Sequence, residues 1–78
     1  MSTVDPISDG PIETPPRGVA PSSEQLAVLI AELSAAGVEL GAYDRRIAEW
    51  VAGWDWMTVA TIASWVRRAA AGNGGSAS

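Results

Sequence analysis

The sequence has no cysteine, no histidine and no lysine among its 78 residues. Structural zinc sites are built from thiolate and imidazole ligands, so the chain lacks the means to hold one, and it cannot form a disulfide. The same absences exclude cysteine nucleophiles and histidine bases. Stability therefore has to come from packing, and three side chains that often carry catalysis, those of cysteine, histidine and lysine, are missing.

Long hydrophobic runs are also absent. The longest purely apolar run covers residues 26–31, and the longest uncharged run covers residues 56–66. Both are shorter than the roughly 18 residues that a membrane-spanning helix needs. The N-terminus does not combine a basic stretch with an apolar run, as a secretory signal would. We therefore expect a cytoplasmic protein that does not use a membrane.

Proline and glycine divide the chain into three parts. All five prolines lie within residues 1–21, and residues 72–78 read Gly-Asn-Gly-Gly-Ser-Ala-Ser. Proline disfavours both helices and central strands, so residues 1–21 are predicted to be a disordered arm. Residues 72–78 are predicted to be a flexible tail. Residues 22–71 remain as one small folded domain.

The first predicted helix begins at Ser22, where Ser22 and Gln25 have the spacing of a capping box. Gly37 stands where a left-handed residue would end the helix, and Val38 is placed to fold back on its last turn. The apolar residues follow one helical face: Leu26, Leu29, Ile30 and Leu33.

The second predicted helix covers residues 41–52, with Asp44 in its first turn. Its large apolar residues form one stripe that we expect to face the core: Tyr43, Ile47, Trp50, Val51 and Trp54. The opposite, outward face would hold Arg45, Ala48, Glu49 and Ala52.

The third predicted helix starts after Asp55 as N-cap and continues to about residue 71. Trp56 would lie on its flank beside the turn. Its apolar stripe is predicted to contain Val59, Ile62, Ala63, Val66 and Ala70. No period-two alternation persists, so the predicted fold is an all-α, three-helix bundle. Because a core of this size is marginal, a partner or a second copy of the chain could complete it.

Catalysis is not predicted, and no catalytic, metal-binding or cofactor-binding residue is proposed. The acids of the domain have ordinary structural explanations: Asp44 and Asp55 stand at helix starts, and Glu49 is spaced to pair with Arg45. A bundle this small rarely encloses the pocket that paired carboxylates need for acid–base work.

A helix-turn-helix that binds DNA is one alternative, because residues 53–55 join the second and third helices by a tight turn. The predicted DNA contacts would be Thr58, Thr61, Ser64, Arg67 and Arg68. Electrostatics oppose this interpretation, since the chain carries a net charge of −4 and residues 22–71 hold six acids against four arginines.

A protein-interaction surface is the preferred interpretation. Trp65 lies at the edge of the third helix's apolar stripe, so it either caps the core or is an exposed anchor. Tryptophan and arginine are enriched at interface hot spots. The candidate partner-binding residues are Met57, Thr61, Trp65 and Arg68. The spacing Pro11-x-x-x-Pro15-Pro16-Arg17 is either a linker or a proline-rich docking segment.

Residues 41–69 contain the pieces Tyr-Asp-Arg-Arg-Ile, Ala-Gly-Trp and Thr-Val-Ala-Thr-Ile-Ala-Ser-Trp. With these pieces the segment resembles small actinobacterial and actinobacteriophage proteins that have no known activity. The resemblance implies a phage or mobile-element accessory or regulatory protein that binds a host protein or itself, and it brings no site residues.

Overall fold

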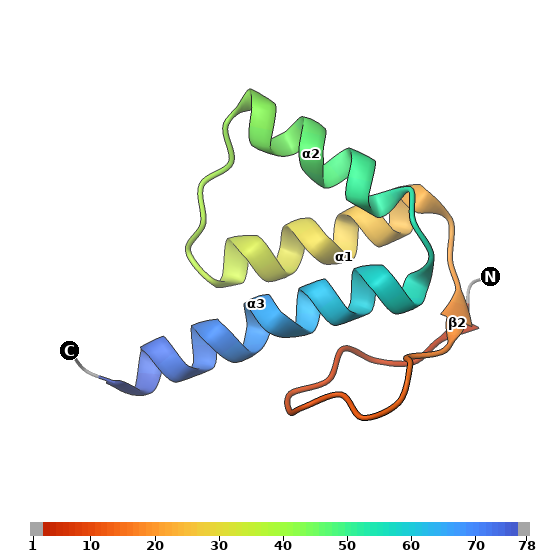
Figure 1. Ribbon diagram of the computed structural model, residues 1–78. Coiled ribbons are helices and arrows are strands. Elements are labelled where there is room, and N and C mark those ends of the chain that lie inside the picture. The colour runs from red at the N-terminus through yellow and green to blue at the C-terminus, as the bar shows by residue number, and fades with distance from the viewer. Residues whose placement is uncertain (1–2, 77–78) are drawn as a thin grey trace.

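Three helices follow a short antiparallel strand pair along the chain (Figure 1). The computed structural model describes the backbone of residues 3–76 and the side chains of residues 3–72. The elements are β1 (Thr3–Val4), β2 (Gly18–Val19), α1 (Ser22–Ala35), α2 (Ala42–Ala52) and α3 (Trp56–Ser76). The predicted all-α, three-helix fold is confirmed.

Helix α1 begins differently from its prediction. Pro21 is the N-cap, and its carbonyl accepts the backbone N–H groups of Glu24 and Gln25. No side chain caps this end, so the predicted capping box is wrong. The Gln25 side chain is buried instead, and its amide nitrogen donates to the carbonyls of Ala52 (2.9 Å) and Trp54 (2.7 Å). Gln25 thereby donates hydrogen bonds to carbonyls at the C-terminal end of α2 that have no partner within the helix.

Substituting Gln25 by leucine is expected to lower the free energy of unfolding by about 1–2 kcal/mol, because two carbonyls lose their donor. Ser22→Ala is the matched control, since Ser22 is exposed and its hydroxyl accepts no capping hydrogen bond. Urea denaturation followed by circular dichroism measures both. A larger loss for Ser22→Ala than for Gln25→Leu would contradict this account and restore the capping box.

The end of α1 agrees with its prediction. Gly37 has φ +82°, a left-handed conformation in which a side chain would be strained. The N–H of Val38 donates to the Leu33 carbonyl (3.0 Å), and the N–H of Gly37 donates to the Ser34 carbonyl (3.0 Å). This hydrogen-bond pair is a Schellman motif.

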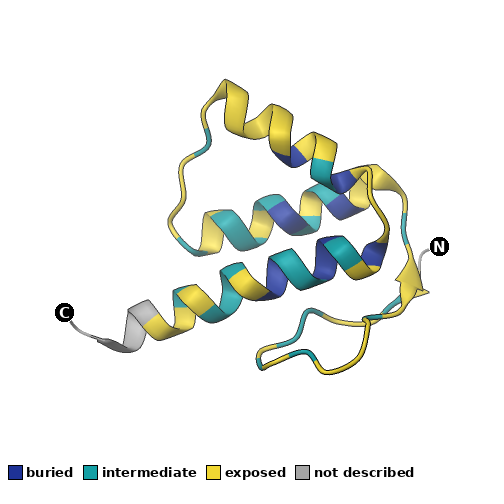
Figure 2. Ribbon diagram, viewed as in Figure 1, coloured by how far each residue is buried: buried dark blue, intermediate teal, exposed yellow. Residues whose placement is uncertain are grey.

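Helix α2 packs with the face that was predicted to point outward. Ala48 and Ala52 are buried, whereas Trp50 is 65% exposed and Trp54 is 52% exposed. Figure 2 shows the buried segments of α2 on the side that faces α1. The predicted core stripe of α2 is therefore wrong, except that Val51 is half-buried against the core.

The flat arrangement of the helices explains this reversal. Helix α1 packs against both α2 and α3, and the molecule measures 40 × 33 × 18 Å. Alanines let α2 approach α1 closely, and no further layer covers the aromatic side of α2. The small residues at the contact between α1 and α2 therefore determine which side of α2 is buried.

Helix α3 supplies most of the core. Asp55 is its N-cap, as predicted: the Thr58 N–H donates to Asp55 Oδ1 (3.0 Å), and hydrogen bonding by Thr58 lowers the pKa of the Asp55 carboxyl. Trp56 is 3% exposed, so it lies in the core and not on the flank. The buried apolar residues are Leu29, Ala48, Ala52, Trp56, Val59, Ala60 and Ala63.

Residues 3–21, called the proline arm below, differ from the prediction of disorder. Thr3 pairs with Val19 and Val4 with Gly18, which closes the arm into a loop. Ile7 packs against the core residues of α1 and α3. Proline blocks helix and sheet, but it does not prevent an extended chain from placing single apolar side chains on a helical surface.

The C-terminal part also differs from its prediction. Helix α3 continues to Ser76, past residue 71 where the helix was predicted to end and the flexible tail to follow. The last part of that predicted tail, residues 77–78, lies outside the described residues, as do residues 1–2 of the predicted arm.

Candidate functional site

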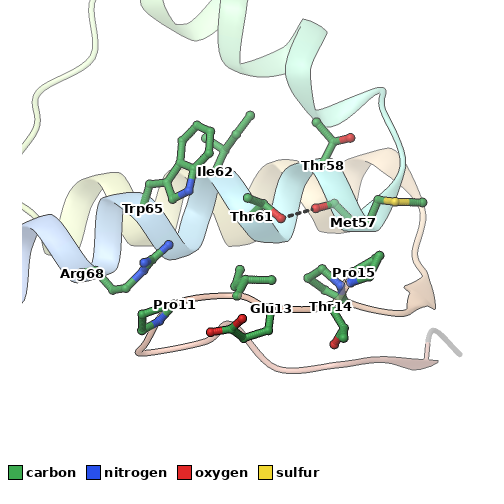
Figure 3. A pocket seen from close by; sticks show the side chains of 12 residues that line it. Pro11, Glu13, Thr14, Pro15, Met57, Thr58, Thr61, Ile62, Trp65 and Arg68 are labelled. Carbon is green, nitrogen blue, oxygen red and sulfur yellow. Dashed lines mark hydrogen bonds between the residues drawn. The ribbon is translucent and has the colours of Figure 1, made fainter.

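An open groove of about 800 Å³ lies between α3 and the proline arm (Figure 3). One wall comes from α3 and the other from the middle of the arm. The lining residues are Pro11, Ile12, Glu13, Thr14, Pro15, Pro16, Met57, Thr58, Thr61, Ile62, Trp65 and Arg68.

The α3 wall brings together all four predicted partner-binding residues, Met57, Thr61, Trp65 and Arg68. Their spacing of four, four and three residues keeps them on one side of the helix. Met57 is 48% exposed and Trp65 is 58% exposed. Trp65 is therefore an exposed side chain of this wall and not part of the buried core.

Thr61 has a more local role than the other three. Its hydroxyl donates to the Met57 carbonyl one turn earlier (2.7 Å), a bond that fixes the hydroxyl against the helix. With its hydroxyl satisfied within the helix, Thr61 lines the groove between Met57 and Trp65.

The arm wall is held in place by polar side chains of α3. The Ser64 hydroxyl donates to the Ser8 carbonyl (2.8 Å), and Arg67 Nη1 donates to the Ile7 carbonyl (3.0 Å). Arg67 also pairs with Asp9 (3.3 Å). These bonds join positions nearly sixty residues apart in the chain.

Arg67 is anchored in turn by Glu32 of α1. Two guanidinium nitrogens donate to the two carboxylate oxygens, with Nε to Oε1 at 3.2 Å. Hydrogen bonding to Glu32 raises the pKa of Arg67, so the guanidinium stays charged. Arg67 therefore links α1, α3 and the arm.

Opposite charges stand on the two rims of the groove. Arg68 Nε donates to the Ser64 hydroxyl (3.1 Å), which orients the guanidinium at the end of the α3 wall. Glu13 lies on the arm wall (Figure 3). A bound segment would meet an apolar centre with a cation on one side and an anion on the other.

The residues predicted to contact DNA do not lie together on one accessible surface. Ser64 is fully buried and Arg67 is engaged by Glu32 and Asp9, contrary to the DNA-binding interpretation. Only Thr58, Thr61 and Arg68 remain along the groove. Helix α2 packs on α1, and Ile47 is exposed where a helix-turn-helix would bury it against the following helix.

Sequence reasoning missed the arm wall of the groove. The spacing from Pro11 to Arg17 had been recognised, but only as a linker or a docking segment for another protein. The available signal was the presence of Val4, Ile7 and Ile12 among the prolines, since single apolar residues allow an extended segment to dock on a helix.

Within the described part of the chain, no group of three acidic side chains lies close enough to hold a metal ion. Among the described helices, none is both long and apolar enough to cross a membrane. Comparison of the chain with family models, curated proteins and solved structures finds no match.

Proposed function

We propose that this chain is a non-enzymatic protein-interaction module that binds an apolar segment of another protein in the groove between α3 and the proline arm. The observation that carries the proposal is the exposure of Met57 and Trp65 beside the half-buried Arg68 on one wall of that groove. Methionine, tryptophan and arginine are the residue types that binding interfaces favour.

The groove indicates the chemistry of its occupant. Its centre takes apolar side chains, because Met57, Ile62 and Trp65 face Pro11 and Pro15. Arg68 at the rim favours a carboxylate beside the apolar part of the segment, since guanidinium–carboxylate pairs are directional. The proposed occupant is thus a short apolar segment flanked by aspartate or glutamate.

The setting of this activity is part of the same proposal. The resemblance to actinobacterial and phage proteins supports an accessory protein, encoded by a phage or mobile element, that regulates a host protein in the cytoplasm. The alternative, a DNA-binding regulator, retains Thr58, Thr61 and Arg68 as its contacts, and the following experiment separates the two.

The full chain, carrying a photoreactive phenylalanine analogue in place of Thr61, is cross-linked in lysate of an actinobacterial host. We expect a discrete adduct whose attached peptide is apolar with a neighbouring acid. Trp65→Ala and Arg68→Ala should each weaken binding of the identified protein at least about tenfold. Trp50→Ala is the matched control, because Trp50 is equally exposed but lies outside the groove, and it should bind like the wild type.

Two outcomes would overturn the proposal. One is an adduct with DNA that Arg68→Ala abolishes, which would establish the DNA-binding alternative. The other is a protein partner that Trp65→Ala binds as tightly as the wild type does. Melting temperatures of all variants show that each is folded when it is tested.

A further inference from the structure

Helix α2 leaves a second apolar surface exposed, separate from the groove. It consists of Tyr43, Ile47, Trp50 and Trp54, which we call the α2 face; Tyr43 is the most exposed of the four, at 72%. Trp50 and Trp54 already contact each other edge to face, with ring centroids 5.7 Å apart. No α2 residue lines the groove, and α2 and the arm lie at opposite edges of the molecule (Figure 1).

The α2 face has the area of a functional surface patch. Three aromatic side chains that are more than half exposed, together with Ile47, leave about 500 Å² of exposed surface, most of it apolar. The largest apolar patch of a typical monomer is of about this size and often has a function. If two such faces met, they would remove about 1,000 Å² from water, the lower limit for a specific interface.

The spacing of the α2 face suits a second copy of the same helix. Its residues are separated by four, three and four positions, the alternation of a coiled-coil seam. When the two-fold axis is perpendicular to the helices, the two copies of α2 are antiparallel, so Ile47 of one copy meets Trp50 of the other, and Tyr43 meets Trp54. The face is thus complementary to itself without any change of register.

Charge at the edge of the α2 face agrees with that arrangement. Arg46 flanks Ile47, is exposed, and forms no ion pair with the described residues. In the antiparallel pair it lies beside the Gly53–Asp55 turn of the second copy. The carbonyl end of a helix and the Asp55 carboxylate both attract a cation there.

We propose that the α2 face is the interface of a symmetric homodimer in which two copies pack α2 against α2, leaving both grooves open. Dimer formation is tested with the purified chain alone, whereas the groove proposal is tested with a separate partner protein. The failure of one proposal can therefore be told from the failure of the other.

Sedimentation velocity on the full chain, from about 10 µM to about 1 mM, tests the homodimer over the range expected of a minimal interface. We expect a concentration-dependent dimer, with the dissociation constant raised at least about tenfold in Trp50→Gln. Trp65→Gln is the matched control and should dimerise like the wild type. Because Trp50 is exposed in the single chain, Trp50→Gln should keep the helicity of the wild type by circular dichroism.

A monomer at every concentration would overturn the proposal. So would a dimer that Trp65→Gln abolishes and Trp50→Gln leaves intact, because the second copy would then occupy the groove.

Discussion

Replacing Trp56 by alanine is expected to lower the free energy of unfolding by about 3–5 kcal/mol. Trp56 is 3% exposed and is the largest side chain of the core, where it packs with Val59 and Ala60 beneath Val4 and Ile7 of the arm. A domain of this length is stable by only about 4–11 kcal/mol. The substitution therefore removes a large share of the total, and Trp56→Ala should be partly or fully unfolded at 37 °C.

Two companion variants make this result specific. Trp54→Ala should cost less than about 1.5 kcal/mol, because Trp54 is half exposed and contributes mainly its edge contact with Trp50. Trp56→Phe should stay within about 1 kcal/mol of the wild type, since the buried Nε1 of Trp56 has no acceptor and phenylalanine removes that donor. Urea denaturation measures all three. Trp54→Ala being the most damaging variant would contradict the described core.

Replacing Arg67 by methionine is expected to cost about 2–3 kcal/mol and to release the proline arm. The change leaves Glu32, whose side chain is only 14% exposed, without its cation. Removal of one partner of a buried pair costs about 3–5 kcal/mol, and the partial exposure of Arg67 reduces that figure through solvent screening. The Ile7 carbonyl and Asp9 lose a donor at the same time.

The neighbouring arginine provides the control. Arg68→Met should change stability by less than about 0.5 kcal/mol, because within the described residues Arg68 makes one hydrogen bond, to the Ser64 hydroxyl, and no ion pair. Hydrogen exchange reports on the arm: the Val4 and Asp5 region should lose protection in Arg67→Met and keep it in Arg68→Met. Equal protection of the arm in both variants would show that Arg67 does not hold it.

Local signals in the sequence predicted the helices well. Asp55 caps α3 and Gly37 ends α1 in the predicted way, because each depends on backbone geometry within a few residues. The spacing of Ser22 and Gln25 was equally regular and yet misleading. The Gln25 amide finds carbonyls near residues 52–54, and no local pattern contains that contact.

Helix α2 shows why amphipathic patterning can point the wrong way. Its aromatic stripe is far more hydrophobic than the side that carries Ala48 and Ala52, so periodicity favoured burying the aromatics. In a flat arrangement, however, close approach to α1 requires small side chains. The choice between the two sides depends on the neighbouring helix, which the sequence of α2 does not describe.

One wall of the candidate site was predictable from the sequence, and the other wall was not. The α3 wall follows from helical spacing alone, so Met57, Thr61, Trp65 and Arg68 were identified together. The arm wall depends on Ser64 and Arg67 reaching carbonyls of Ser8 and Ile7, contacts that no sequence period contains. Those same contacts turn two predicted DNA-contacting residues into structural ones.

The four tryptophans of the chain lie in three different environments. Their indole N–H resonances therefore provide the most direct test of the groove as the partner-binding site. Trp56 lies in the core, Trp65 on the groove, and Trp50 and Trp54 on the α2 face. When the cross-linked partner segment is added as a peptide to the ¹⁵N-labelled full chain, the Trp65 indole signal should shift and those of Trp50 and Trp54 should not. An unchanged Trp65 signal, with shifts confined to Trp50 and Trp54, would contradict the assignment of the groove as the partner-binding site.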